Sequence, residues 1–147
     1  MKSAGMTENA QTTADTMKKE TEILAINPGS TTTKIAVFRG GTELFSKTIT
    51  HEAAELKAMG DIFGQMDFRE KLIREVLKEE NYDVGRLSAT VGRGGMIIGL
   101  HGGGYRVTEK LCQAMRNPGN PPHASSMGAA VSYTHPEPTR LRCISYA

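Results

Sequence analysis

The sequence contains no tryptophan and only four phenylalanines and four tyrosines among its 147 residues. Such a low aromatic content leaves few rings on which the bases of a single-stranded nucleic acid could stack. An excess of one charge is also missing, because 18 Lys and Arg against 16 Asp and Glu give a formal net charge of +2. No broad electrostatic field therefore attracts DNA or RNA. The composition predicts that nucleic acid is not a partner.

Cysteine and long apolar runs are scarce as well. Cys112 and Cys143 are the two cysteines, and they form no CxxC motif. This disfavours a secreted domain built on disulfides and favours a reducing compartment. No apolar run approaches the ~20 residues of a membrane helix, and residues 1–20 lack the apolar core of a signal peptide. We therefore expect a cytoplasmic protein with no membrane partner.

The length and the hydrophobic content of 38% suit one ordinary domain. Residues 1–20 are polar and aperiodic, so we expect a disordered extension, with Met17 as an alternative natural start. Residues 134–147 read THPEPTRLRCISYA, with two nearby prolines and no periodicity of either kind. We expect residues 21–133 to form the domain and residues 134–147 to be a non-native tail, produced by truncation, a frameshift or read-through of the gene.

Strand patterns dominate the first part of the domain. Short runs at residues 23–26 and 34–38 are apolar and rich in β-branched residues, and alternation continues over residues 43–50. Gly40 and Gly41 form the turn between the last two. The pattern predicts a three-stranded antiparallel meander.

The period then changes to that of a helix. Over residues 67–80, five apolar residues recur on one face, with Asp67 as the expected N-cap and a favourable i,i+4 pair from Glu70 to Arg74. We expect the charged face of this helix to be solvated. The apolar residues are Phe68, Leu72, Ile73, Val76 and Leu77.

Glycine-rich segments follow a fourth strand expected over residues 87–91. That strand runs into Gly92–Gly95, and a loop with further glycines comes next. Thr108 is then expected to cap a helix, and residues 123–132 look like the first turns of another. The Thr108 helix would bury Leu111, Cys112 and Met115.

Between the first two strands, residues 27–34 read NPGSTTTK and are expected to form a loop. Its amides and four consecutive hydroxyls offer many donors, and Gly29 permits close backbone approach. Lys34 adds a point charge for phosphate oxygens, and Asn27 a neutral oxygen for magnesium or its waters. A donor-rich turn of this kind is an anion site. The alternative is a loop whose hydroxyls bind only its own backbone. The sequence has no GxxxxGK[ST] and no GxGxxG.

The NPGSTTTK segment resembles the first phosphate loop of the superfamily that contains acetate and sugar kinases, heat-shock chaperones and actin. Three further segments agree in order and spacing with the acetate kinase family, and most closely with the butyrate kinases. They are MDFREKLIREVLKEE, TVGRGGMIIGLHGGGYRVTEKL and HASSMGA. The resemblance covers roughly residues 20–133.

The resemblance implies an α/β fold, the N-terminal domain of a ribonuclease H-like or actin-like ATPase, with a mixed sheet that opens in the antiparallel meander. It implies ATP-dependent, reversible phosphorylation of butyrate or a branched short-chain fatty acid to an acyl phosphate in fermentation, with Mg²⁺. The domain would be incomplete, so this chain would be an inactive N-terminal fragment. The full-length parent is expected to be a homo-oligomer.

Roles for several residues follow from the resemblance alone. Arg93 would hold the substrate carboxylate and the transferring phosphoryl group, and His123 would contact the phosphoryl group. A surface arginine and a helix-capping or surface histidine are the simpler alternatives. His51 and His101 have no such context, and we expect both to be solvated. ATP phosphates and magnesium would be bound by Asn27 (also the metal ligand), Gly29, Ser30, Thr31, Thr32 and Lys34.

The sequence also departs from the acetate kinase pattern. Pro28 stands in the loop, and Gly92-Arg93-Gly94-Gly95 lacks the preceding histidine, which would leave room beside Arg93 for a longer acyl chain. Positions for the family's catalytic Asp, second Arg, adenosine motif and distal metal-binding Glu are missing. Another short-chain acyl kinase such as an acetate kinase, and a non-catalytic actin-like or chaperone-like nucleotide-binding module, are the alternative functions. A sugar kinase would need an Asp placed as a base, which we do not find.

Overall fold

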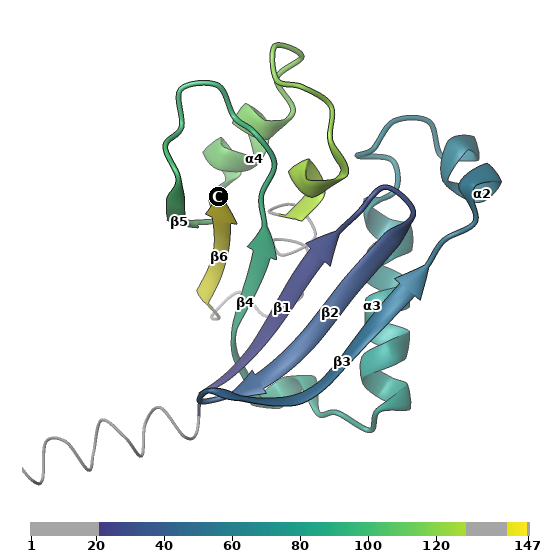
Figure 1. The fold of residues 1–147 in the computed structure, drawn as a ribbon, viewed down its shortest axis with the longest axis vertical. Helices are drawn as coiled ribbons and strands as arrows, with labels where there is room; N and C mark the ends of the chain where they lie inside the picture. The colour runs from purple at the N-terminus through teal and green to yellow at the C-terminus, as the bar shows by residue number, and fades with distance from the viewer. Residues whose placement is uncertain (1–20, 129–140, 147) are drawn as a thin grey trace, which may run out of the picture.

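Residues 21–128 and 141–146 are described by the structure, a computed structural model, and they build an α/β fold around one six-stranded sheet (Figure 1). The strand order across the sheet is β3-β2-β1-β4-β6-β5, so strands distant in sequence become neighbours. The elements in chain order are β1 (Glu22–Pro28), β2 (Thr32–Arg39), β3 (Thr42–Thr50), α2 (Ala53–Ala58), α3 (Met66–Glu79), η1 (Val84–Arg86), β4 (Leu87–Arg93), β5 (Gly103–Arg106), α4 (Glu109–Met115), η2 (Ala124–Ser126) and β6 (Leu141–Tyr146).

The predicted meander is confirmed, since β2 pairs antiparallel with both β1 and β3. The predicted loop over residues 27–34 is wrong. Asn27 pairs with Lys34 and Pro28 with Thr33, which leaves only residues 29–31 as the hairpin loop. Pro28, which has no N–H to donate, lies beyond Ile26, where the pairing of β1 with β4 ends. The polar segment is therefore held on two rigid strands.

The core lies between the meander and α3. Leu24 and Ile26 of β1 alternate inward, and together with Ile35 and Val37 of β2 they pack against this helix. The other face of the same strands carries Ala25 and Asn27, which are only half-buried. Strand alternation thus gives β1 one face for the core and one for a site. Ile73 and Leu77 are the most buried apolar residues of α3.

Helix α3 itself was predicted, but its start and the burial of Arg69 were not. It begins at Met66 after Gln65, and no side chain caps it, so Asp67 lies inside the first turn instead of at the N-cap. The expected pair between Glu70 and Arg74 forms at 2.6 Å. The charged outer face is exposed or partly exposed, as expected, but Arg69 lies on the buried face of the helix and is only 1% exposed.

The fourth strand, β4, runs parallel to β1 and continues two residues beyond its predicted end, to Arg93. After it, the glycine loop contains an unpredicted strand, β5. The Thr108 hydroxyl accepts from the Leu111 N–H and caps α4, as predicted. Cys112 is buried in α4, and this burial raises the pKa of its thiol.

The expected non-native tail is partly ordered in the sheet. Residues 141–146 form β6, parallel to β4 and antiparallel to β5. The sequence of residues 134–147, which has no periodicity of either kind, did not indicate this strand, and its origin as a non-native tail stays a prediction. Short helix α2 was also not predicted. The proposed N-terminal extension, the helix expected beyond Gly128 and residues 134–140 lie outside the described residues.

Across the part of the chain that the structure describes, no helix is long and apolar enough to cross a membrane.

Candidate functional site

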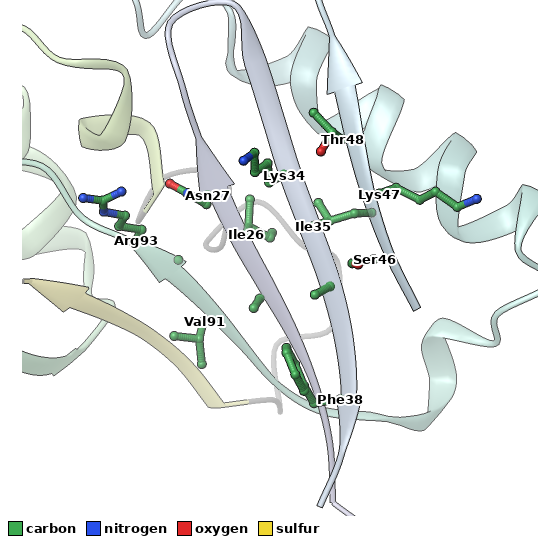
Figure 2. Close-up of a pocket in the computed structure, with 13 residues that line it drawn as sticks. Ile26, Asn27, Lys34, Ile35, Phe38, Ser46, Lys47, Thr48, Val91 and Arg93 are labelled. Carbon is green, nitrogen blue, oxygen red and sulfur yellow. The ribbon is translucent and has the colours of Figure 1, made fainter. Parts of the chain in front are cut away.

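Three of the predicted site residues meet on the face of the sheet turned away from α3. Asn27 is the penultimate residue of β1, Lys34 is its partner on β2, and Arg93 ends the parallel strand β4. All three line one cavity of about 690 Å³. Figure 2 shows Asn27 between Lys34 and Arg93, with apolar side chains such as Phe38 and Val91 along the strands below them. The sheet therefore presents an amide, an ammonium and a guanidinium together.

A second cavity, also about 690 Å³, begins on the other side of Arg93. Its wall is largely apolar, and two of its side chains, Met96 and Ile98, are 65% and 70% exposed. Arg93 is thus shared between a cavity with polar donors and a cavity with an apolar wall. The apolar residues that line the second cavity are Met96, Ile97, Ile98, Leu100 and Pro121, and the polar residues His123 and Ser125 line it as well.

His123 stands at the start of η2, and its ring caps that turn. Its Nδ1 accepts a hydrogen bond from the Ser125 N–H at 3.1 Å. The capping role considered as an alternative is therefore present. It does not exclude the predicted role, since Nε2 has no hydrogen-bond partner among the described residues, and the ring lines the second cavity. In this arrangement Nε2 carries the proton of a neutral ring and can donate it to an oxygen.

The HASSMGA segment and the GRGG segment are held in close backbone contact by two glycines. A Cβ built on Gly95 would stand 2.5 Å from Ser126 Oγ, and one on Gly128 would stand 2.0 Å from the Arg93 carbonyl oxygen. A Cβ on Gly95 would also stand 2.9 Å from the Ser126 backbone nitrogen, and real Cβ atoms essentially never come within 3.0 Å of another atom, so both positions favour glycine. The two motifs identified separately in the sequence are one packed unit beside Arg93.

The remaining predicted residues, Gly29, Ser30, Thr31 and Thr32, lie in the hairpin and line neither of these cavities. Gly29 closes the hairpin through its N–H, which donates to the Thr32 carbonyl oxygen at 2.7 Å. The hairpin is adjacent to the first cavity, because Asn27 and Lys34 precede and follow it on the same two strands.

A buried polar cluster beneath the hairpin was missed by the sequence reasoning. Arg69 donates to Thr33 Oγ1 at 2.9 Å, and the same hydroxyl lies 2.8 Å from Nε2 of His51. The expectation that His51 is solvated is wrong, since it is 4% exposed. Burial and the positive charge of Arg69 both lower the pKa of His51. No periodicity signals this cluster, because its members come from β2, α3 and the segment after β3.

The two lysines that line the first cavity differ in whether a carboxylate neutralises them. Lys47 also lines it, but its Nζ binds Glu80 at 2.7 Å, and Figure 2 shows it directed away from Asn27. Lys34 forms no ion pair within the described part of the chain. Lys34 and Arg93 are therefore the cations available to an anion there.

Within residues 21–128 and 141–146 no cluster of three or more His, Cys, Asp or Glu could hold a metal ion. Magnesium in nucleotide sites needs less than that, because it keeps several waters and takes most of its other ligands from phosphate oxygens. Asn27 provides a single amide oxygen on the wall of the first cavity, beside the two cations that suit phosphate. This arrangement fits a magnesium ion that is bound mainly by water and phosphate.

Comparison with known proteins gives consistent results. No protein-family profile matches the sequence. The chain is 40% identical over 111 residues to butyrate kinase 2 of Clostridium acetobutylicum, and 41% identical over 111 residues to a probable butyrate kinase of Listeria monocytogenes. Each match covers 76% of this chain and 31% of the relative, so the chain spans about a third of the length of these relatives.

Solved structures show the same fold at lower identity. Acetate kinase from Entamoeba histolytica superimposes with a TM-score of 0.58 at 17% identity, over 86% of this chain and 34% of that one. A propionate kinase from Francisella tularensis superimposes with a TM-score of 0.52 at 14% identity, over 86% of this chain and 36% of that one. The fold is therefore that of part of these kinases, as the sequence predicted.

Proposed function

Because the chain is related to the butyrate kinases over 111 of its residues, we propose that it forms the phosphate-facing and carboxylate-facing part of a carboxylate kinase. The proposed reaction is reversible transfer of the γ-phosphoryl group of ATP to a short carboxylate, which gives an acyl phosphate and ADP. Butyrate or a branched short-chain fatty acid is the proposed substrate, and Mg²⁺ the accompanying ion.

The position of Arg93 between the two cavities carries this proposal. On one side it adjoins Asn27 and Lys34, which suit phosphate, and on the other it adjoins an apolar wall. A planar guanidinium can bind a carboxylate or a phosphoryl group through two parallel hydrogen bonds. A carboxylate seated on Arg93 with its alkyl chain along Ile97 and Leu100 would face a phosphoryl group in the first cavity.

The other predicted residues have roles in the same proposal. Lys34 would contact phosphate oxygens, and Asn27 would contact magnesium or one of its waters. His123 would donate from Nε2 to the transferring group, which needs electrostatic stabilisation more than covalent help. The hairpin residues Gly29, Ser30, Thr31 and Thr32 would bind phosphate through their amides and hydroxyls.

Turnover is proposed for a protein of the relatives' length, and homo-oligomer formation and a cytoplasmic location of such a protein stay predictions. We expect the 147-residue chain alone to bind phosphate ligands without forming acyl phosphate. The other candidate functions give different results. An acetate kinase would prefer acetate in a panel of short carboxylates, and a non-catalytic nucleotide-binding module would bind nucleotide with no dependence on Arg93.

The test is a chimera in which residues 21–128 replace the matched segment of the Clostridium acetobutylicum butyrate kinase 2. It should form acyl phosphate from ATP, Mg²⁺ and butyrate, detected as the hydroxamate. Arg93→Ala should lower kcat/KM by about 10²–10³, as loss of a donor to developing charge does. Arg106→Ala, on β5, is the matched control and should leave it unchanged. Equal activity of the chimera and its Arg93→Ala variant would refute the proposed role of Arg93.

A further inference from the structure

Three consecutive carbonyl oxygens at the tip of the hairpin, those of Ser30, Thr31 and Thr32, accept hydrogen bonds from distant parts of the chain. The Ser30 oxygen accepts from Nη2 of Arg69 at 3.0 Å, and the Thr32 oxygen accepts from Nη1 at 2.9 Å. The Thr31 oxygen accepts from the main-chain N–H of His51 at 2.8 Å. These three consecutive carbonyl oxygens are therefore all bound by groups from α3 and from the segment after β3.

Two main-chain N–H groups at the same tip, in contrast, have no hydrogen-bond partner in the described part of the chain. The main-chain N–H groups of Ser30 and Thr31 donate to no group among the described residues. Successive unbonded N–H groups in a turn can form a concave set of donors, and such sets bind anions. The tip of the hairpin is thus polarised: the Ser30 and Thr31 carbonyls are bound to the protein, and the N–H groups of the same two residues are available to a ligand.

Arg69 is the residue that imposes most of this polarity. Besides the two carbonyl oxygens, its guanidinium donates to Thr33 Oγ1 and twice to Gln65 Oε1. Its five hydrogen bonds all end on uncharged oxygens, and it forms no ion pair with a carboxylate of the described chain. With the side chain 1% exposed, its charge is neither hydrated nor paired.

A buried charge without a counter-ion is costly, so it is expected where an anion offsets it. Lys would not serve in this position, because only a planar fork reaches two carbonyls, a hydroxyl and an amide together. The field of this charge extends to the hairpin directly above it through a poorly polarisable interior. It favours an anion at the Ser30 and Thr31 amides.

We propose that Arg69 is a positioning residue for the phosphate hairpin: it fixes the Ser30 and Thr32 carbonyls inward and adds an uncompensated positive charge beneath the loop. The inference rests on the proposed function, in which the hairpin binds phosphate. Arg69 does not touch the ligand. It acts through the backbone that does.

The experiment follows the Ser30 and Thr31 amide resonances of the 147-residue chain during titration with inorganic pyrophosphate and with MgADP. Arg69→Met keeps the volume of the side chain and removes its charge and its donors. This variant should stay folded and bind both probes at least tenfold more weakly. Arg69→Lys should recover part of the loss, because it restores the charge and not the fork. Arg74→Met, also on α3 but facing Glu70, should bind like the wild type.

Wild-type affinity in a folded Arg69→Met variant would overturn the inference. If that variant unfolds, the Arg69 Nη–H resonances of the wild-type chain provide the test. They should exchange slowly with water, and they should shift together with the hairpin amide resonances when pyrophosphate is added. Rapidly exchanging resonances, or resonances unmoved while the amides shift, would also overturn it. Failure of the proposed function looks different, since then the wild-type hairpin responds to neither probe although the Arg69 resonances are still protected.

Discussion

Gly128 lies directly against the main-chain oxygen of Arg93, so closely that a Cβ on Gly128 would stand 2.0 Å from that oxygen. The contact joins the segment after η2 to the end of β4, two parts of the chain that were recognised only as separate motifs. It fixes the backbone from which the Arg93 side chain projects into both cavities.

Gly128→Ala should therefore displace the end of β4 and disturb the position of Arg93. We expect the free energy of unfolding to fall by about 1–3 kcal/mol, the usual cost of overpacking, as measured by urea denaturation. Gly41→Ala is the matched control, because a Cβ there meets nothing within 4 Å. Its stability should stay within about 0.5 kcal/mol of the wild type. Equal stability of the two variants would contradict the close contact.

Lys34 and Lys47 line the same cavity, but only Lys34 should contribute to phosphate binding. Lys34→Met should weaken pyrophosphate binding about fivefold, equivalent to about 1 kcal/mol, measured by calorimetry at low ionic strength. Lys47→Met should change the affinity less than twofold, because its ammonium is already bound to Glu80. A larger loss in Lys47→Met than in Lys34→Met would place the anion elsewhere in the cavity.

Glu22, at the opposite end of β1, should stabilise the fold through its charge. Burial alone raises the pKa of its carboxyl. Hydrogen bonds from Tyr82 and Arg39, with the charges of Arg39 and Arg86, outweigh this and lower the pKa below its ordinary 4.5. Glu22→Gln should lower the free energy of unfolding by about 2–3 kcal/mol at pH 7. Glu70→Gln, which breaks only the pair with Arg74 on a helix surface, should cost about 0.5 kcal/mol.

The pH dependence of the Glu22 contribution has a definite sign. A carboxyl whose pKa is lower in the folded state stabilises above the unfolded pKa, and the contribution is lost as the pH falls through the folded pKa. The difference in stability between the wild type and Glu22→Gln should therefore be constant from pH 7 to about 5 and shrink below pH 4.5. A constant difference down to pH 3 would contradict this assignment.

His51 should make the stability of the fold depend on pH in a higher range than Glu22 does. Its pKa is lowered from 6.5 by burial and by Arg69, so below pH 6.5 the unfolded chain takes up a proton that the folded chain does not. Stability should then fall on acidification from pH 6.5 towards 5, by at most about 1.4 kcal/mol per pH unit. The His51→Gln variant can keep the hydrogen bond to Thr33, and its free energy of unfolding should change less with pH between 6.5 and 5. The His101→Gln variant, changed at an exposed position, should show the same pH dependence of stability as the wild type.

Local periodicity made much of the fold predictable. The meander, α3, the start of β4 and the Thr108 cap follow from alternation, helical spacing and hydroxyl capping within a few neighbouring residues. The chemical character of the site was readable for the same reason. Asn27, Lys34 and Arg93 stand in short motifs whose donors suit phosphate and carboxylate.

The ends of several elements and the whole of strand β6 could not be predicted from the sequence. The hairpin loop is shorter than expected because pairing across the strands extends to Asn27 and Lys34, and cross-strand hydrogen bonds leave no local signal. Strand β6 forms between β4 and β5, so its partners lie 37 or more positions earlier in the chain, the smallest separation being that of Arg106 and Cys143. The segment itself has no periodicity that would have indicated a strand.

The sequence by itself determined which groups are present and which segments form the meander and its helix, because both depend on residue type and short-range spacing. Only the tertiary structure decided where Arg69 goes. A charged residue on a helix is expected in water, and it is buried here because carbonyls 37 and 39 residues away satisfy its donors. The same assembly placed Arg93 between two cavities, since β1 and β4 become neighbours only in the folded sheet.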